Sequence, residues 1–123
     1  MPHEINTLGL AYIGDAVYEL KCREAAYSAG FSTAETLHRE TVKKVNANSQ
    51  AVLSHKLAEL LTDEERAVWT RGRNAKVRAI PKNSSEAEYH YATALETVFG
   101  WLFLNGGGER IDELFSILQQ GEK

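Results

Sequence analysis

Two carboxylates lie in the middle of strongly apolar stretches that have the residue spacing of helices. Asp15 lies in LGLAYIGDAVYEL, residues 8–20, and Glu96 lies in YHYATALETVFGWLFL, residues 89–104. No basic residue stands three or four positions from either acid, so neither has a partner one helical turn away. If packing brings the two together, each makes the other harder to ionise, and a divalent cation between them offsets that cost. The pair therefore indicates a hard metal ion and hydrolytic chemistry. A capping or pairing role inside the core is the alternative.

Positive charge is concentrated in one part of the chain, although the formal net charge is −3. Residues 38–82 hold ten Lys and Arg against five acids, and the segment from Arg66 to Lys82 holds six basic residues and no acid. Such segregation predicts a local site for a polyanion on an otherwise acidic body. A solvated basic surface loop is the alternative.

The elements that must position these residues are all expected to be helices. Long stretches repeat their apolar residues at three and four positions, and turn residues separate these stretches. A first helix is expected from near Glu4 to Ala29, with Gly30 as its stop. Two more are expected between Thr33 and Leu61, with a break near Asn46–Ser49. The remaining expected elements are a helix over Asp63–Arg71, a basic loop over Gly72–Ser84, a helix over Glu86–Leu104 and a closing helix with a stripe of Ile111, Leu114, Phe115 and Leu118.

Three residue pairs fit capping boxes, in which side chain and backbone satisfy each other's free groups at a helix start. The pairs are Ser32 with Glu35, Thr62 with Glu65, and Ser85 with Glu88. They mark three expected helix starts.

Two glycines lie inside expected helices, where each costs about 1 kcal/mol relative to alanine. These are Gly14, next to the first acid, and Gly100, one turn after the second. Close approach of another backbone would explain both of them. A simple bend of the long first helix is the alternative for Gly14.

The composition favours a single globular domain over residues 1–123. The hydrophobic fraction of 43% and the charged fraction of 25% argue against disordered and fibrous classes. No apolar run approaches the roughly 20 residues that span a bilayer, and the first ten residues lack the pattern of a secretory signal. The single cysteine, Cys22, excludes an internal disulfide. We therefore expect a cytoplasmic protein with no membrane partner.

Several motifs, taken in order, resemble one family of nucleases. LAYIGDAVYEL resembles the signature helix of ribonuclease III endonuclease domains, and TALETVFGWLFL resembles their second acidic helix. The chain is closer still to the Mini-ribonuclease III subfamily, through RGRNAK at Arg71–Lys76, PKN at Pro81–Asn83, YHYAT before the glutamate and VNANSQA at Val45–Ala51. This resemblance covers essentially the whole chain. It implies an all-α homodimer that cuts both strands of an RNA duplex with Mg²⁺, without a double-stranded-RNA-binding domain.

Carried over residue by residue, the resemblance implies that Asp15 and Glu96 are the catalytic residues and the metal ligands. Ribonuclease III has two further acids where this sequence has Ala11 and Thr93. With two protein ligands an ion would keep several waters, and Thr93 could hold one of them. Glu19 could be an outer ligand, although a buried structural hydrogen bond is favoured for it. The number of Mg²⁺ ions per site, one or two, remains open. The metal would activate a water for in-line attack on phosphorus.

The basic segment suits the phosphates and 2′-hydroxyls of an A-form duplex. The candidate RNA-binding residues are Arg71, Arg73, Asn74, Lys76, Arg78 and Lys82. By resemblance, the substrate would be a stem in precursor 23S ribosomal RNA, and a ribosomal protein bound to that precursor is a further candidate partner. Exposed apolar residues of the first helix are expected to serve the homodimer. The alternatives are a non-catalytic helical RNA-binding or ribosome-associated module, motivated by the two missing acids, and a helical protein-interaction domain.

Overall fold

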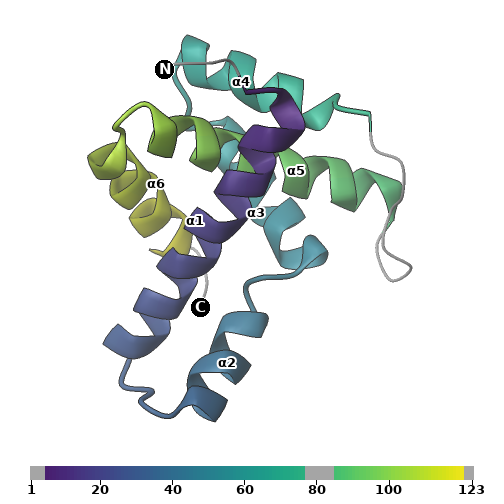
Figure 1. Cartoon of the computed structure of the whole chain (residues 1–123). Coiled ribbons are helices and arrows are strands. Elements are labelled where there is room, and N and C mark those ends of the chain that lie inside the picture. Colours follow the sequence, from purple (N-terminus) through teal and green to yellow (C-terminus); the bar gives the residue numbers. More distant parts are fainter. Residues whose placement is uncertain (1–4, 77–84, 121–123) are drawn as a thin grey trace.

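A computed structural model describes residues 5–76 and 85–120, and this part of the chain forms helices and no strand (Figure 1). The helices are α1 (Thr7–Ser28), α2 (Ala34–Val42), α3 (Ala47–Ala58), α4 (Asp63–Arg73), α5 (Glu86–Leu104) and α6 (Gly108–Gln120). The expected all-α class is confirmed. No helix in the described ranges is long and apolar enough to cross a membrane.

Helix α5 lies at the centre of the fold, as its apolar composition predicted, and its bounds are those expected. Helices α1, α3 and α4 all pack against it, while α2 lies at one end of the molecule beside α1 (Figure 1). Leu95, Val98 and Phe99 of α5 are fully buried. Tyr18 of α1 meets Phe99 edge to face, with the ring centroids 5.6 Å apart. Such aromatic pairs contribute about 0.5–1.5 kcal/mol beyond the area that they bury.

Helices α1 and α5 cross with their backbones in contact. A Cβ atom built on Gly14 would lie 1.6 Å from the backbone oxygen of Glu96, and one built on Gly100 would lie 1.9 Å from that of Leu10. Both distances are far shorter than any real Cβ contact, so only glycine fits at either position. Close approach of another backbone, which was one of the two explanations for Gly14, is therefore confirmed. The crossing sets the residue after Gly14 beside Glu96.

Capping boxes mark two helix starts where the sequence predicted them. Thr62 and Glu65 cap α4, and Ser85 and Glu88 cap α5. The Asn46 side chain accepts a hydrogen bond from Ser49 N at 2.9 Å, so the expected break is the start of α3.

The third expected capping box, Ser32 with Glu35, is wrong by one residue. Thr33 caps α2 instead: its Oγ1 accepts from Thr36 N at 3.1 Å, while Thr36 Oγ1 accepts from Thr33 N at 3.3 Å. Two adjacent hydroxyl residues are both able to cap, and the hydroxyl of Thr36 does what a glutamate does in the usual box.

Helix α1 begins at Thr7 rather than near Glu4, which lies outside the described residues. The Asn6 side chain accepts from Gly9 N at 2.7 Å and so fixes the start. The helix ends at Ser28, one residue before the expected Ala29, and Gly30 follows with φ +108°.

Helix α4 continues to Arg73, two residues beyond the expected end. Gly72 packs against α5, where a Cβ would lie 2.5 Å from Thr97 Oγ1, and this tight contact holds the last turn in helical form. Most of the expected basic loop, residues 77–84, lies outside the described residues. The expected stripe on α6 is confirmed, because its four members are all buried: Ile111, Leu114, Phe115 and Leu118.

Candidate active site

The α1–α5 crossing brings the two sequence-predicted acids together. The pKa of Glu96 is raised to about 8, mainly by its burial, then by the charge of Asp15 and by a hydrogen-bonding contact with Asp15. Glu96 is half-buried, whereas Asp15 is exposed rather than enclosed among apolar side chains. The two carboxyl groups, 81 positions apart in sequence, therefore form one acidic site that opens to solvent.

A third side chain joins this site that was not among the candidates. Gln50 of α3 is buried, and its Nε2 donates a hydrogen bond to Glu96 Oε2 at 3.1 Å. This bond lowers the pKa of Glu96, against the two larger effects that raise it. Gln50 lies within the VNANSQA motif, but nothing in its spacing pairs it with a residue 46 positions later.

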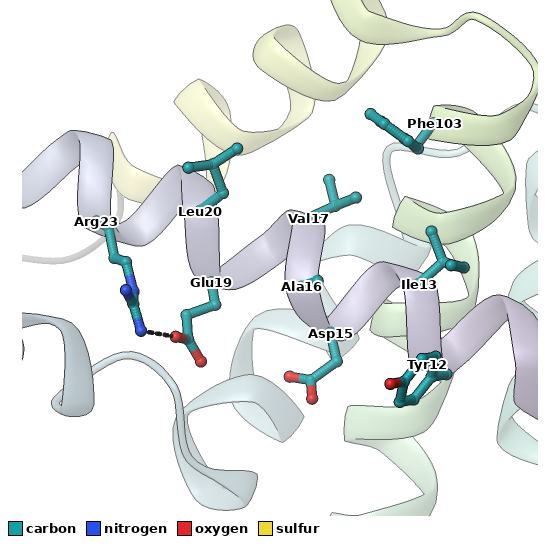
Figure 2. A pocket seen from close by; sticks show the side chains of 9 residues that line it. All are labelled: Tyr12, Ile13, Asp15, Ala16, Val17, Glu19, Leu20, Arg23 and Phe103. Atoms are coloured by element: carbon teal, nitrogen blue, oxygen red, sulfur yellow. Dashed lines mark hydrogen bonds and ion pairs between the residues drawn. The ribbon is translucent and has the colours of Figure 1, made fainter.

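An open groove of about 680 Å³ runs along α1 beside the acidic site. Figure 2 shows Asp15 and Glu19 on one side of α1, and Val17 and Leu20 on the other, facing Phe103 of α5. The groove therefore has an acidic edge and an apolar edge.

Glu19 forms an ion pair with Arg23, one turn further along α1 (Figure 2). Its side chain is partly exposed on the surface of the groove. The prediction that Glu19 forms a buried structural hydrogen bond is therefore wrong. Whether Glu19 serves as an outer metal ligand stays a prediction.

Thr93, one turn before Glu96 on α5, is buried, and its hydroxyl donates to the backbone oxygen of Tyr89 at 2.8 Å. A hydroxyl that donates in this way still has lone pairs with which to accept a bond from a water. The suggested role of Thr93 in holding a water thus stays a prediction.

The chemistry of the two acids fits a hard divalent cation. Neither carboxylate forms an ion pair with a Lys or Arg of the described residues. Those residues also contain no cluster of three or more His, Cys, Asp or Glu that could hold a metal. A cation at Asp15 and Glu96 would therefore take its other ligands from water and substrate phosphate, which is the usual environment of Mg²⁺.

The last turn of α4 presents several of the candidate RNA-binding residues. The guanidinium of Arg73 lies over the ring of Trp69, 5.3 Å from its centroid, and Arg73 Nε donates to Asn74 Oδ1 at 3.3 Å. The same turn packs against Ala94 and Thr97 through Gly72. The basic end of α4 therefore lies against the part of α5 that carries the acidic site.

The other candidates divide between described and undescribed parts of the chain. Arg71 and Lys76 are exposed, and Arg71 Nη2 lies 3.5 Å from Thr7 Oγ1 of α1. Arg78 and Lys82 lie outside the described residues.

Comparisons with known proteins cover most of the chain. Residues 8–107 match the family model of the Ribonuclease III domain. The chain is 41% identical over 113 residues to the Mini-ribonuclease 3 of Symbiobacterium thermophilum, an alignment that covers 92% of this chain and 87% of that protein. It is 39% identical over 115 residues to the Mini-ribonuclease 3 of Enterococcus faecalis, with the same two coverages. A crystal structure of a Fusobacterium nucleatum protein matches with a TM-score of 0.87 at 30% identity, covering 98% of this chain and 97% of that one.

Proposed function

Since this chain belongs to the ribonuclease III family, and within it to the Mini-ribonuclease 3 group, it is an endoribonuclease, and we propose that it cleaves both strands of double-stranded RNA with Mg²⁺. One observation carries the proposal: Asp15 and Glu96 share an acidic site in which the pKa of Glu96 is raised to about 8. Two adjacent carboxyl groups that resist ionising together are stabilised in their charged form by a cation.

Asp15 and Glu96 are the residues that would hold one or two Mg²⁺ ions. When bound, the metal supplies charge stabilisation on a phosphate and a water that is acidic enough to attack it. The exposed Asp15 is accessible to the substrate, while Glu96 is held deeper, by α5. Thr93 and Glu19, on the same two helices, would act only through waters.

The basic end of α4 is the proposed contact with the RNA backbone. Arg73 is already held against Trp69 and Asn74, so it loses little conformational freedom when it binds a phosphate. Arg71, Asn74 and Lys76 extend the same surface, and Arg78 and Lys82 are its proposed continuation. Salt-dependent affinity without sequence preference is what such contacts provide.

We further propose that the protein works as a homodimer. Three large apolar side chains beside the acidic site are mostly exposed: Tyr12 at 79%, Leu20 at 55% and Phe103 at 56%. All three line the same groove, and exposed apolar side chains that gather in this way mark interfaces. A two-fold pair of chains would carry two equivalent acidic sites, one for each strand of a duplex.

A stem in precursor 23S ribosomal RNA is the proposed physiological substrate, with the cytoplasm as the place of reaction. The support for this step is the resemblance to Mini-ribonuclease III. A ribosomal protein bound to the precursor is the proposed additional partner.

The proposal is tested by incubating the protein with a long RNA duplex in Mg²⁺ or in a chelator, and by measuring binding and cleavage. We expect cleavage of both strands in Mg²⁺ and binding alone in chelator. Asp15→Asn should bind the duplex but cleave it at least 100-fold more slowly. Glu24→Gln, on an exposed position of the same helix, is the matched control and should cleave normally.

Each alternative function predicts a different outcome of the same assay. Binding without cleavage at any Mg²⁺ concentration would identify the non-catalytic RNA-binding module that Ala11 and Thr93 suggest. Absence of binding would identify a protein-interaction domain.

A further inference from the structure

We propose that Gln50 is a positioning residue, which holds the Glu96 carboxylate in the orientation that binds the cation. This inference rests on the proposed function, because it assigns a task to a neighbour of the proposed metal ligands. It adds a third helix, α3, to a site that the sequence motifs place on α1 and α5 alone.

The contact between Gln50 and Glu96 is built into the core of the fold. Only 4% of Gln50 is exposed, and its Nε2 donates to Glu96 Oε2 at 3.1 Å. Helix α3 packs along α5, so the two residues approach each other from adjacent elements. A buried amide that donates a hydrogen bond to a carboxylate restrains the orientation of that carboxylate.

The start of α3 is anchored independently, which fixes where Gln50 points. Asn46 Oδ1 accepts from Ser49 N at 2.9 Å, and Asn46 Nδ2 lies 3.1 Å from the backbone oxygens of both Val42 and Lys43. Ser49 Oγ donates to the same Lys43 oxygen at 3.0 Å. Gln50 follows directly, in the first turn of the helix. A segment held by four hydrogen bonds therefore positions the Gln50 side chain beside Glu96.

A neutral amide suits this task better than a charged or apolar side chain. A Lys or Arg at position 50 would neutralise Glu96 and compete with the cation for it. A carboxylate there would add a third negative charge to the pair formed with Asp15. An apolar residue would remove the hydrogen bond that α3 donates to Glu96 Oε2. An amide donates a hydrogen bond and leaves the negative charge of the site intact.

A merely structural role for Gln50 predicts something different from the proposed one. Loss of a buried hydrogen bond would lower the stability of the fold, whereas loss of positioning would lower the affinity for a cation. Ser54 provides a matched control on the same helix. It is fully buried, and its Oγ accepts a hydrogen bond from Trp69 Nε1 at 3.0 Å. This hydrogen bond does not involve Glu96.

The experiment measures Mn²⁺ binding to the full chain without RNA, by calorimetry or by electron paramagnetic resonance. Gln50→Leu should bind Mn²⁺ at least about tenfold more weakly than wild type, the effect typical of partners that orient metal ligands. Its RNA affinity in chelator should be unchanged. Ser54→Ala should keep wild-type Mn²⁺ affinity even if its melting temperature falls. Asp15→Asn removes a proposed ligand, so its Mn²⁺ affinity is the reference for loss of a metal ligand.

Gln50→Asn keeps the inference testable if Gln50→Leu fails to fold. It retains a polar amide but is one methylene shorter, so its amide cannot reach Glu96 and it should also bind Mn²⁺ more weakly. Wild-type Mn²⁺ affinity in the folded Gln50 variants, in a protein that itself binds Mn²⁺ and cleaves duplex RNA, would overturn this inference alone. A wild-type protein that neither binds Mn²⁺ nor cleaves RNA would overturn the proposed function together with this inference.

Discussion

Gly14 lies directly against the backbone carbonyl of Glu96, so closely that a Cβ at Gly14 would be 1.6 Å from that oxygen. The contact joins the middle of α1 to the middle of α5. Because Asp15 follows Gly14 in the chain, the contact that requires a glycine also sets the first acid beside the second. Backbone packing and the candidate chemistry are thus parts of one feature.

Gly14→Ala should destabilise the protein severely, by about 3 kcal/mol or more, because an added methyl group must push two backbones apart. Urea denaturation followed by circular dichroism measures the loss. Gly108→Ala is the control, since a Cβ there meets nothing within 4 Å. A stability of Gly14→Ala close to that of Gly108→Ala would mean that the helices do not cross in contact.

The stability of the metal-free protein should fall as the pH rises toward 8. Burial and Asp15 raise the pKa of Glu96 from 4.5 to about 8, so between these values the folded chain keeps a proton that the unfolded chain has released. Stability falls with pH wherever the folded state binds more protons.

Glu96→Gln should abolish this fall, because the amide does not titrate. At pH 8 we expect the free energy of unfolding of the variant to exceed that of wild type by on the order of 2 kcal/mol, after allowance for solvent screening. Near pH 4.5 this difference in stability should disappear. Urea titrations at pH 5 and pH 8 in chelator provide the comparison. Identical pH dependence in both proteins would rule out the raised pKa.

Reversing the charge of Arg73 and Lys76 together should weaken duplex RNA binding at least tenfold and flatten its dependence on salt. Fluorescence anisotropy with labelled duplex at several salt concentrations measures both. Arg39→Glu is the control, because α2 lies at the opposite end of the molecule from α4 (Figure 1). An unchanged salt slope in the Arg73 and Lys76 variant would remove the basic end of α4 from the RNA contact.

Replacing Tyr12 by Lys should convert the proposed dimer to a monomer, because a charge would then have to be buried in the interface at an exposed position of the groove. Sedimentation of the metal-free protein reports the change. Tyr27→Lys is matched in chemistry and exposure, since Tyr27 is 72% exposed near the other end of α1. A wild-type protein that sediments as a monomer, or two variants that both remain dimers, would contradict the proposed interface.

Local signals in the sequence were sufficient for much of the fold. The bounds of α5 followed from a capping box at Ser85, a long apolar run and a group of glycines after Leu104. Local signals failed where two adjacent residues could do the same work, as with the cap of α2. They also failed at Gly72, since its contact with α5 extends α4 past the expected end.

The acidic site was predictable only in part. Asp15 and Glu96 stood out because each is a carboxylate in an apolar helix without a basic partner one turn away. Gln50 carries no such signal, because glutamine is common in helices and its contact with Glu96 arises only when α3 packs on α5. The exposure of Asp15 likewise depends on which face of α1 packing leaves uncovered, and residue spacing alone does not decide this.

Asp15 and Glu96 are proposed to hold a divalent cation together, at a place that an RNA phosphate can reach. Crystals soaked in Mn²⁺, with diffraction measured at the manganese absorption edge, test this claim most directly. We expect an anomalous peak within about 2.0–2.4 Å of a carboxylate oxygen from each residue. A crystal without such a peak, with the two carboxylates turned away from each other, would contradict the claim.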